Sequence, residues 1–183
     1  MANNLKTKVI TGIVRLSYEH VWEPASINGG EPKYSASLII PKSDKKTVAD
    51  IEAAVEAAIT EGIGKFGGKK PNKAALKLPL RDGDTEREDE AYANSFFVNA
   101  NSKTAPQIVD RAVRPILDRN EVYSGCYIRA SLSFYAFNSN GNKGVACGLN
   151  NIQKVKDGEP LGGRTNAADD FTALDSSDED FLS

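Results

Sequence analysis

Apolar and polar positions in the first sixty residues predict two strands followed by one helix. Residues 6–18 are rich in β-branched side chains and are typical of a long strand, and residues 33–40 predict a second one. Beyond them, apolar residues recur every three or four positions, which indicates one amphipathic helix. These residues are Val48, Ile51, Val55, Ala58 and Ile59. Ser43 or Asp44 is the expected N-cap, and Gly62 is expected to end the helix.

Further strands are predicted in the second half of the chain. Residues 62–84 are rich in Gly and Lys and are expected to form a long loop, whereas residues 92–98 predict a short aromatic strand. Residues 126–137 and 143–149 are predicted to pair as a hairpin, because Asn140-Gly141 is a strong turn signal. Strands with one inserted helix and long loops predict a mostly β fold: an OB-type small β-barrel that is partly open.

The segment 126–137 is predicted to have two chemically different faces, because successive side chains of a strand point to opposite sides. One face is wholly apolar and belongs in the core. The other carries Tyr127, Arg129, Ser131, Ser133, Tyr135 and Phe137. Aromatic rings stack on bases, and arginine binds phosphate or stacks on a base, so this face is a candidate surface for a single strand of DNA. The alternative is that the helix or a loop covers these rings.

The same hairpin gives an expectation for the two cysteines. If Asn138 pairs with Lys143, Cys147 lies opposite Phe134 on the core face, and Cys126 lies on that face farther along. Both cysteines are therefore expected to be small buried side chains, neither a disulfide nor a pair of metal ligands.

A basic segment precedes the middle of the chain. Residues 62–81 contain no acid, and their basic residues are Lys65, Lys69, Lys70, Lys73, Lys77 and Arg81. A mobile cationic segment can follow a phosphate backbone without reading its sequence. A solvated lysine-rich loop is the alternative. On the first strand, Arg15 is a further phosphate candidate, and Tyr18 and Trp22 are further stacking candidates, although Trp22 fits a core position equally well.

Charge is unevenly distributed along the chain. Residues 165–183 hold six acids and no Lys or Arg, which leaves 19 acids against 23 basic residues in 1–164. This asymmetry points to a polyanion partner. We expect one OB-fold domain over 1–163 and a disordered acidic tail over 164–183. In the tail, acids adjoin large apolar residues, as in short protein-recognition segments; an ordinary disordered end is the alternative. The candidate recognition residues are Asp178, Glu179, Asp180, Phe181 and Leu182.

Several short segments occur in a characteristic order and spacing over almost the whole chain. They are Arg15-Leu16-Ser17-Tyr18, Lys33-Tyr34-Ser35, Leu38-Ile39-Ile40-Pro41-Lys42, Pro79-Leu80-Arg81-Asp82-Gly83-Asp84, Tyr123-Ser124-Gly125-Cys126-Tyr127, Asn142-Lys143-Gly144 and Gly148-Leu149-Asn150-Asn151-Ile152-Gln153-Lys154-Val155. With the acidic end, this series resembles the OB-fold single-stranded-DNA-binding proteins of tailed bacteriophages. The resemblance implies binding and protection of single-stranded DNA without sequence preference, during phage DNA replication and recombination in the host cytoplasm. It also implies a tail that contacts replication proteins, and we expect that tail to compete with DNA. The tail ends Asp-Phe-Leu-Ser, not in the terminal Phe of the bacterial cellular proteins, so recognition by the same host pockets is not expected.

An enzyme is the main competing class, and none is expected, with no cofactor and no metal. The chain has one histidine, His20, which cannot build a multi-histidine site, and it has no phosphate-binding Gly-rich loop. The acidic run of residues 82–90 suggests Mg²⁺ or Ca²⁺, but the calcium-loop pattern fails at Arg87 and Ala93. We expect these acids to form a solvated charged turn, and a metal-dependent nuclease is a remote alternative.

Other binding functions remain open at this point. A single-strand annealing or recombination mediator would use the same surfaces and is the first alternative. Duplex or RNA reading by the helix is disfavoured, because the helix carries Asp50, Glu52, Glu56 and Glu61, which phosphate would repel. No apolar run reaches membrane-spanning length, so no membrane partner is expected. A homo-oligomer is compatible with the sequence.

Overall fold

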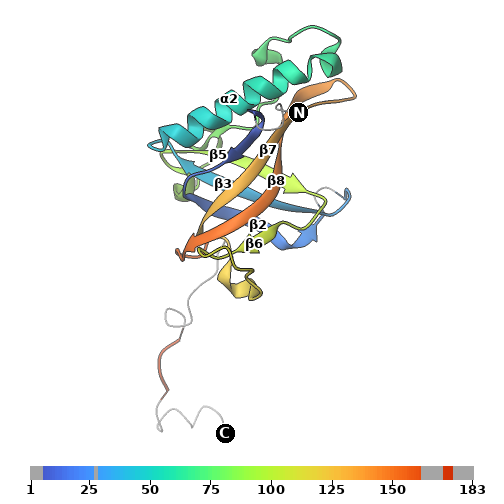
Figure 1. The fold of residues 1–183 in the computed structure, drawn as a ribbon. Helices are drawn as coiled ribbons and strands as arrows, with labels where there is room; N and C mark the ends of the chain where they lie inside the picture. Colours follow the sequence, from blue (N-terminus) through green and yellow to red (C-terminus); the bar gives the residue numbers. More distant parts are fainter. Residues whose placement is uncertain (1–5, 27–28, 162–170, 175–183) are drawn as a thin grey trace.

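The chain folds around a mostly β framework with one sizeable helix, which confirms the predicted class (Figure 1). The computed structural model describes residues 6–26, 29–161 and 171–174. The strands are β1 (Lys8–Ile10), β2 (Val14–Ala25), β3 (Lys33–Pro41), β4 (Arg81–Asp82), β5 (Ser95–Ser102), β6 (Gln107–Val109), β7 (Tyr127–Ser139) and β8 (Asn142–Lys156). The helices are α2 (Lys45–Glu61), the short α3 (Gly83–Glu86) and the 3-10 turns η1 (Ile63–Phe66), η2 (Lys73–Ala75), η3 (Glu90–Tyr92) and η4 (Arg119–Glu121).

Five of the strands pair in a ring. β7 pairs with β2, β2 with β3, β3 with β5, and β8 closes the ring by pairing with both β5 and β7. Two of these joints are short, because β2–β7 and the parallel β5–β8 contact each comprise only two residue pairs. The remaining short strands add to the edges of β7, β5 and β8. The predicted partly open barrel is thus present.

Apolar side chains fill the ring, and α2 lies across one end of it (Figure 1). The helix packs against β1, β7 and β8. Its predicted start and end are confirmed: the Asp44 side chain accepts a hydrogen bond from the Thr47 backbone N–H, and Gly62 is the C-cap. A Cβ at Gly62 would collide with the Ala136 methyl group, so a glycine is needed where the helix end meets β7.

The β7–β8 hairpin has the register that the sequence predicts. Asn138 pairs with Lys143, and Phe134 pairs with Cys147. Alternate residues of β7 are buried, and both cysteines are buried as free thiols. Burial raises the pKa of both thiols, which keeps them protonated at neutral pH. These cysteines behave as small core residues.

Three expected elements differ from the structure. The strand predicted over 6–18 is broken between β1 and β2, because the Gly12 N–H donates to Thr47 Oγ1 (2.9 Å) and the chain bends toward the start of α2. The aromatic strand predicted over 92–98 lies at 95–102, since Tyr92 belongs to η3. The long loop predicted over 62–84 contains η1, η2, β4 and the start of α3.

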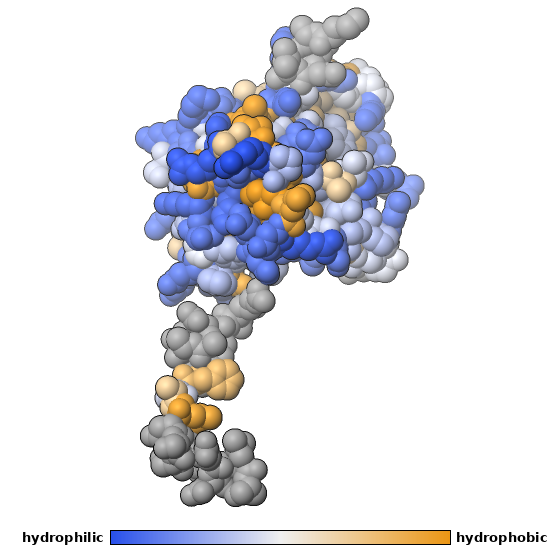
Figure 2. Space-filling view, turned by 60° about the horizontal axis from the view of Figure 1, so that its bottom comes forward, coloured by the Kyte–Doolittle hydropathy of each residue, from blue (hydrophilic) through white to orange (hydrophobic). Residues whose placement is uncertain are grey.

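Figure 2 shows the end of the molecule that lies below β6 in Figure 1. The surface is mostly hydrophilic with small apolar patches, and the 171–174 segment shows orange between grey stretches. Phe171 and Leu174 in this segment are 75% and 77% exposed. Among the helices of the described residues, none combines the length and apolar character needed to cross a membrane.

Candidate nucleic-acid interface

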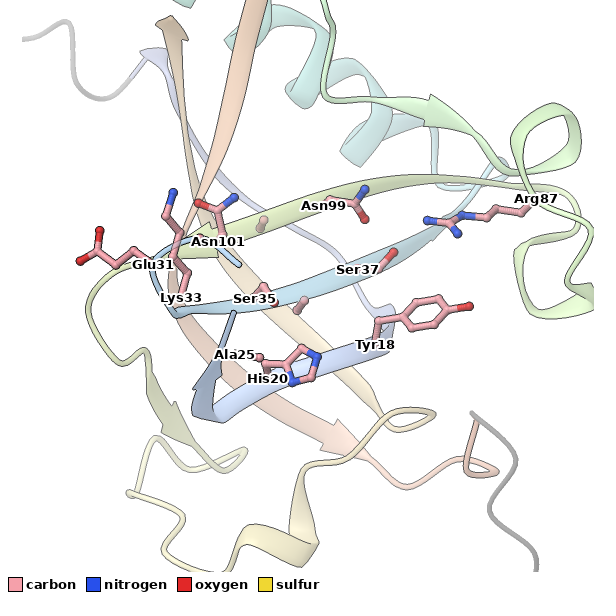
Figure 3. Close-up of a pocket in the computed structure, with 13 residues that line it drawn as sticks. Tyr18, His20, Ala25, Glu31, Lys33, Ser35, Ser37, Arg87, Asn99 and Asn101 are labelled. Atoms are coloured by element: carbon pink, nitrogen blue, oxygen red, sulfur yellow. The ribbon is translucent and has the colours of Figure 1, made fainter. Parts of the chain in front are cut away.

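The outer faces of β2, β3 and β5 form an open cleft of about 640 Å³ (Figure 3). Tyr18 and Arg87 lie at one end of it, and Glu31 and Lys33 at the other. The residues between them are mostly small or polar, among them His20, Ser35, Ser37, Asn99 and Asn101. The cleft therefore offers an aromatic ring and a cation at one end, an acid and a cation at the other, and a floor able to form hydrogen bonds.

Tyr18 is directed into the cleft by an irregularity in β2. The pairing of β2 with β3 shifts register between Ser17 and His20, and Tyr18 has a positive φ of 45°. Such bulges re-aim side chains, and a positive φ in a bulky residue is uncommon and costs conformational energy. The ring is 57% exposed. The local backbone thus presents a tyrosine ring to the cleft instead of packing it into the barrel.

Arg87 is held beside Tyr18 by aromatic rings. Its Cζ lies 5.0 Å from the ring centre of Phe97, 5.3 Å from that of Tyr92 and 5.6 Å from that of Tyr18. Tyr92 and Phe97 pack edge to face and are buried, and the Tyr92 hydroxyl donates to Ser37 Oγ (2.9 Å). No carboxylate of the described residues forms an ion pair with Arg87. The guanidinium is therefore pre-positioned with its charge available to a phosphate or a base.

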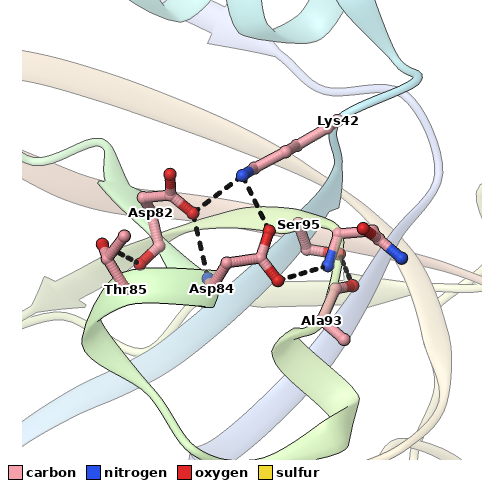
Figure 4. A network of polar contacts seen from close by, with 7 residues as sticks. Lys42, Asp82, Asp84, Thr85, Ala93 and Ser95 are labelled. Atoms are coloured by element: carbon pink, nitrogen blue, oxygen red, sulfur yellow. Dashed lines mark hydrogen bonds and ion pairs between the residues drawn. The ribbon is translucent and has the colours of Figure 1, made fainter.

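A network of polar contacts fixes the segment that carries Arg87 (Figure 4). Lys42 Nζ lies 2.9 Å from Asp82 Oδ1 and 2.8 Å from Asp84 Oδ2. The Asn94 N–H donates to Asp84 Oδ1 (2.9 Å), so one carboxylate joins the start and the end of the excursion between β4 and β5. Hydrogen bonds from Lys42 lower the pKa of both aspartates. The sequence predicted that these acids form a solvated turn; in the structure Asp82 and Asp84 instead bind Lys42 and hold the Arg87 segment in place. We call this set of contacts the Lys42 clasp.

The acidic cluster does not form a metal site in the described part of the chain. Among those residues, no group of three or more His, Cys, Asp or Glu side chains is arranged to hold an ion. Asp82 and Asp84 are engaged by a lysine. The arrangement of the cleft is suited to binding a polyanion with planar bases, with stacking on Tyr18 and charge contacts from Arg87 and Lys33.

Of the residues predicted on β7, the structure places Arg129, Tyr135 and Phe137 on its outer face, away from the cleft. Tyr135 is 46% exposed, Arg129 is exposed and donates from Nε to the Thr11 carbonyl (3.0 Å), and Phe137 is half-buried. Tyr127 is also half-buried: its ring lies near Gly158 and beneath Arg15 and Lys156, whose cationic groups are 5.6 and 4.9 Å from the ring centre. These four residues do not line the β2–β3–β5 cleft.

Arg15 and Trp22 have structural contacts. Arg15 donates from Nε to the Gly125 carbonyl (3.0 Å) and from a terminal nitrogen to the Glu159 carbonyl (2.7 Å), which ties the start of β2 to the chain beyond β8. Trp22 packs against the barrel core and donates from Nε1 to the Val122 carbonyl (2.9 Å). Their predicted DNA contacts stay predictions.

The predicted basic segment is spread over several places. Lys70 and Lys73 both pair with Glu56 on α2, and Lys69 is exposed. The Lys65 ammonium donates to the Ala136 carbonyl (3.0 Å), and the backbone of Lys77 bridges to Gly144. Arg81 does not line the cleft either: its Cζ is 5.7 Å from the centre of the Phe97 ring, which Arg87 also contacts, and it pairs with Glu86. The tail residues 178–182 lie outside the described residues.

Comparison with known proteins assigns the chain to a family. The family model described as "Enterobacter phage Enc34, ssDNA-binding protein" matches residues 7–182. The chain belongs to this family. Protein p50 of Acyrthosiphon pisum secondary endosymbiont phage 1 is 32% identical in an alignment 182 positions long, which covers 96% of this chain and 98% of that one.

Solved structures confirm the OB-type fold of this member of the Enc34 family. The single-stranded DNA-binding protein of bacteriophage Enc34, in complex with single-stranded DNA, superposes with a TM-score of 0.75 at 24% identity over 85% of this chain and 90% of that one. The gp2.5 single-stranded DNA-binding protein of bacteriophage T7 gives a TM-score of 0.62 at 14% identity over 90% and 94% of the two chains. The resemblance read from the sequence is thus confirmed.

Sequence reasoning missed most of the cleft of this Enc34-family protein. It named Tyr18 as a stacking candidate but considered His20 only as too few histidines for a metal site and Arg87 only as a mismatch in a calcium pattern. Arg87 lies between acids at Glu86 and Glu88, which hides it in a count of charge. The available signal was the polar alternation of Lys33, Ser35 and Ser37 along a strand whose other face is apolar.

Proposed function

We propose that this protein binds single-stranded DNA without sequence preference, in the cleft formed by β2, β3 and β5. Bases stack on Tyr18, and Arg87 and Lys33 contact phosphates or bases at the two ends. His20, Ser35, Asn99 and Asn101 form adaptable hydrogen bonds along the floor. Such a site reads the backbone and the base planes and not the base edges, so affinity depends little on sequence. The protein acts by binding and protecting the strand, not as an enzyme, during phage DNA replication and recombination.

The position of the Arg87 side chain is the main support for this proposal. Three rings surround a guanidinium that has no carboxylate partner among the described residues, and the Lys42 clasp fixes the segment behind it. A purely structural arginine would be expected to pair with a carboxylate or to donate to buried carbonyl groups. A positioned, unpaired cation beside an exposed tyrosine is instead suited to a ligand that has both phosphates and rings.

The acidic tail follows a residue that packs beside the same cleft. Leu161, directly before residues 162–170, packs against the cluster of Ile39, Tyr92 and Phe97 that seats Arg87. The last described residue before the tail thus lies beside the rings that contact Arg87, and six acids follow it in the sequence. On this proposal the tail competes with DNA for the cleft and, once displaced, is free to recruit replication and recombination proteins.

Replacing Arg87 with alanine tests the cleft through its salt dependence. Each phosphate contact of a single strand contributes about 0.7 to the slope of log K against log salt concentration. The Arg87→Ala protein is expected to bind oligo-dT more weakly and with a slope smaller by about 0.7. Fluorescence anisotropy of labelled oligo-dT over a series of salt concentrations measures both quantities.

The matched control is Arg114→Ala, since Arg114 is an exposed arginine in an ion pair with Asp110 and does not line the cleft. This variant is expected to retain the affinity and slope of the unmodified protein. Equal behaviour of the two variants, with circular dichroism showing both folded, would rule out Arg87 as a DNA contact.

A further inference from the structure

A second depression, of about 580 Å³, lies on the outer face of β7 and β8, across the ring from the cleft. β1 and the end of α2 border it. Tyr135 lies in it, with Ser133 and Asn150 on its floor and Lys8 and Lys65 among its lining residues. The depression combines an aromatic ring, small polar groups and cations, as the cleft does, but shares no residue with it.

Tyr135 presents an exposed ring on this face. Its ring lies over Gly148, where a Cβ would be 3.6 Å from Tyr135 Cε1 and 3.4 Å from the Ser133 carbonyl oxygen. A glycine beneath the ring allows it to lie close to the sheet. Within the described part of the chain, the tyrosine side chain has no ring contact, no cation contact and no hydrogen bond. A half-exposed aromatic ring without partners is suited to stacking on a base.

Polar groups adjoin this ring because β8 carries an irregularity here. The pairing of β7 with β8 shifts register between Ser131 and Leu132, opposite Asn150. The Asn150 amide donates to Ser133 Oγ (2.9 Å) and lies 3.5 Å from Ser131 Oγ. Its amide oxygen accepts no hydrogen bond in the described residues and can accept one from a base. Small polar side chains that can form hydrogen bonds therefore lie beside the Tyr135 ring and leave room for a base.

Cations flank the ring on two sides. Lys65 is fixed at one edge by its hydrogen bond to the Ala136 carbonyl, and Lys8 of β1 lies directly opposite Ser133 in the sheet. Glu61 is the one acid among the residues that line the depression. Arg129 extends the same outward row of β7, six residues from Tyr135. Basic side chains able to contact phosphate therefore lie on more than one side of Tyr135.

We propose that this depression is a second binding surface for single-stranded nucleic acid, with a base stacked on Tyr135 and phosphates near Lys8 and Lys65. The inference rests on the proposed function, because it assumes that the cleft binds the first strand. One chain then holds two single strands, or two stretches of one strand, on opposite sides of the barrel. A chain that holds two strands is also what the annealing alternative requires.

Counting short oligonucleotides tests the second surface. Native mass spectrometry of the full chain, saturated with oligo-dT too short to reach around the barrel, is expected to show two oligonucleotides per chain. Tyr135→Ala is expected to bind one, and Tyr135→Phe, which keeps the ring, is expected to bind two. At the oligo-dT concentration that only just saturates the unmodified chain, Tyr18→Ala, weakened in the cleft, is expected to bind one, at the Tyr135 surface.

The outcomes separate this inference from the proposed function. If the unmodified chain binds one oligonucleotide and Tyr18→Ala abolishes binding, the second surface is refuted and the cleft stands. Two oligonucleotides on Tyr135→Ala also refute it, because charge alone would then hold the second strand. If Tyr135→Ala loses one oligonucleotide and Tyr18→Ala loses none, the Tyr135 surface stands and the cleft proposal fails.

Discussion

Replacing Tyr18 with alanine is expected to weaken the binding of oligo-dT in the cleft by about 5- to 150-fold. Stacking of a base on an aromatic side chain contributes about 1–3 kcal/mol, and about 1.4 kcal/mol corresponds to a tenfold change in affinity. The ring is exposed at the end of the cleft, so its loss removes the stacking surface without opening the core. Anisotropy with oligo-dT just long enough to span the cleft measures the change, and making it in a Tyr135→Ala background keeps the Tyr135 surface from contributing.

Two matched variants sharpen this prediction. Tyr18→Phe retains the ring and is expected to bind within about twofold of the unmodified protein, since no hydrogen bond of the Tyr18 hydroxyl forms within the described residues. Leu117→Ala removes another exposed large side chain that does not line the cleft, and is expected to have no effect. A Tyr18→Ala protein that binds as tightly as Leu117→Ala would show that bases do not stack on Tyr18.

Alanine substitutions at two neighbouring residues of β7 are expected to differ strongly in their effect on stability. Phe134 is 2% exposed inside the barrel, whereas Tyr135 is 46% exposed outside it. Phe134→Ala is expected to lower the free energy of unfolding by about 3–5 kcal/mol, through lost burial and the cavity left behind. Tyr135→Ala is expected to lower it by less than about 1 kcal/mol, as surface substitutions usually do.

Urea denaturation followed by circular dichroism measures both changes. Phe134→Leu, which retains much of the buried volume, is expected to fall between the two alanine variants. If Tyr135→Ala were as destabilising as Phe134→Ala, the assignment of the two faces of β7 would be wrong. The Tyr135 surface would then lose its basis as well.

Local patterns in the sequence predict the β7–β8 hairpin and α2 because short-range rules decide these elements. Asn140-Gly141 sets the turn, and Asn140 has the positive φ of 51° that this turn requires. Once the turn is fixed, a period of two places Ile128, Leu132 and Phe134 of β7 inside. Asp44 and Gly62 mark the ends of the helix by capping, which depends on neighbours in the chain.

The cleft could be predicted only in part, because long-range contacts build it. Tyr18 was a candidate from its residue type, but its direction depends on a bulge against β3 that no local pattern shows. The position of Arg87 depends on its contact with Phe97 of β5 and on the Lys42 clasp, neither of which is local in the sequence. Conversely, Lys70 and Lys73 have no acid near them in the sequence, yet both pair with Glu56 on α2 once the chain folds.

On the proposed function this chain binds single strands in preference to duplex, and a titration with oligo-dT and a matched duplex at two salt concentrations measures that preference. We expect binding of oligo-dT that is tighter than binding of the duplex and that weakens as salt increases. Failure of oligo-dT to bind at either salt concentration, even after removal of residues 165–183 to relieve competition by the tail, would contradict the account.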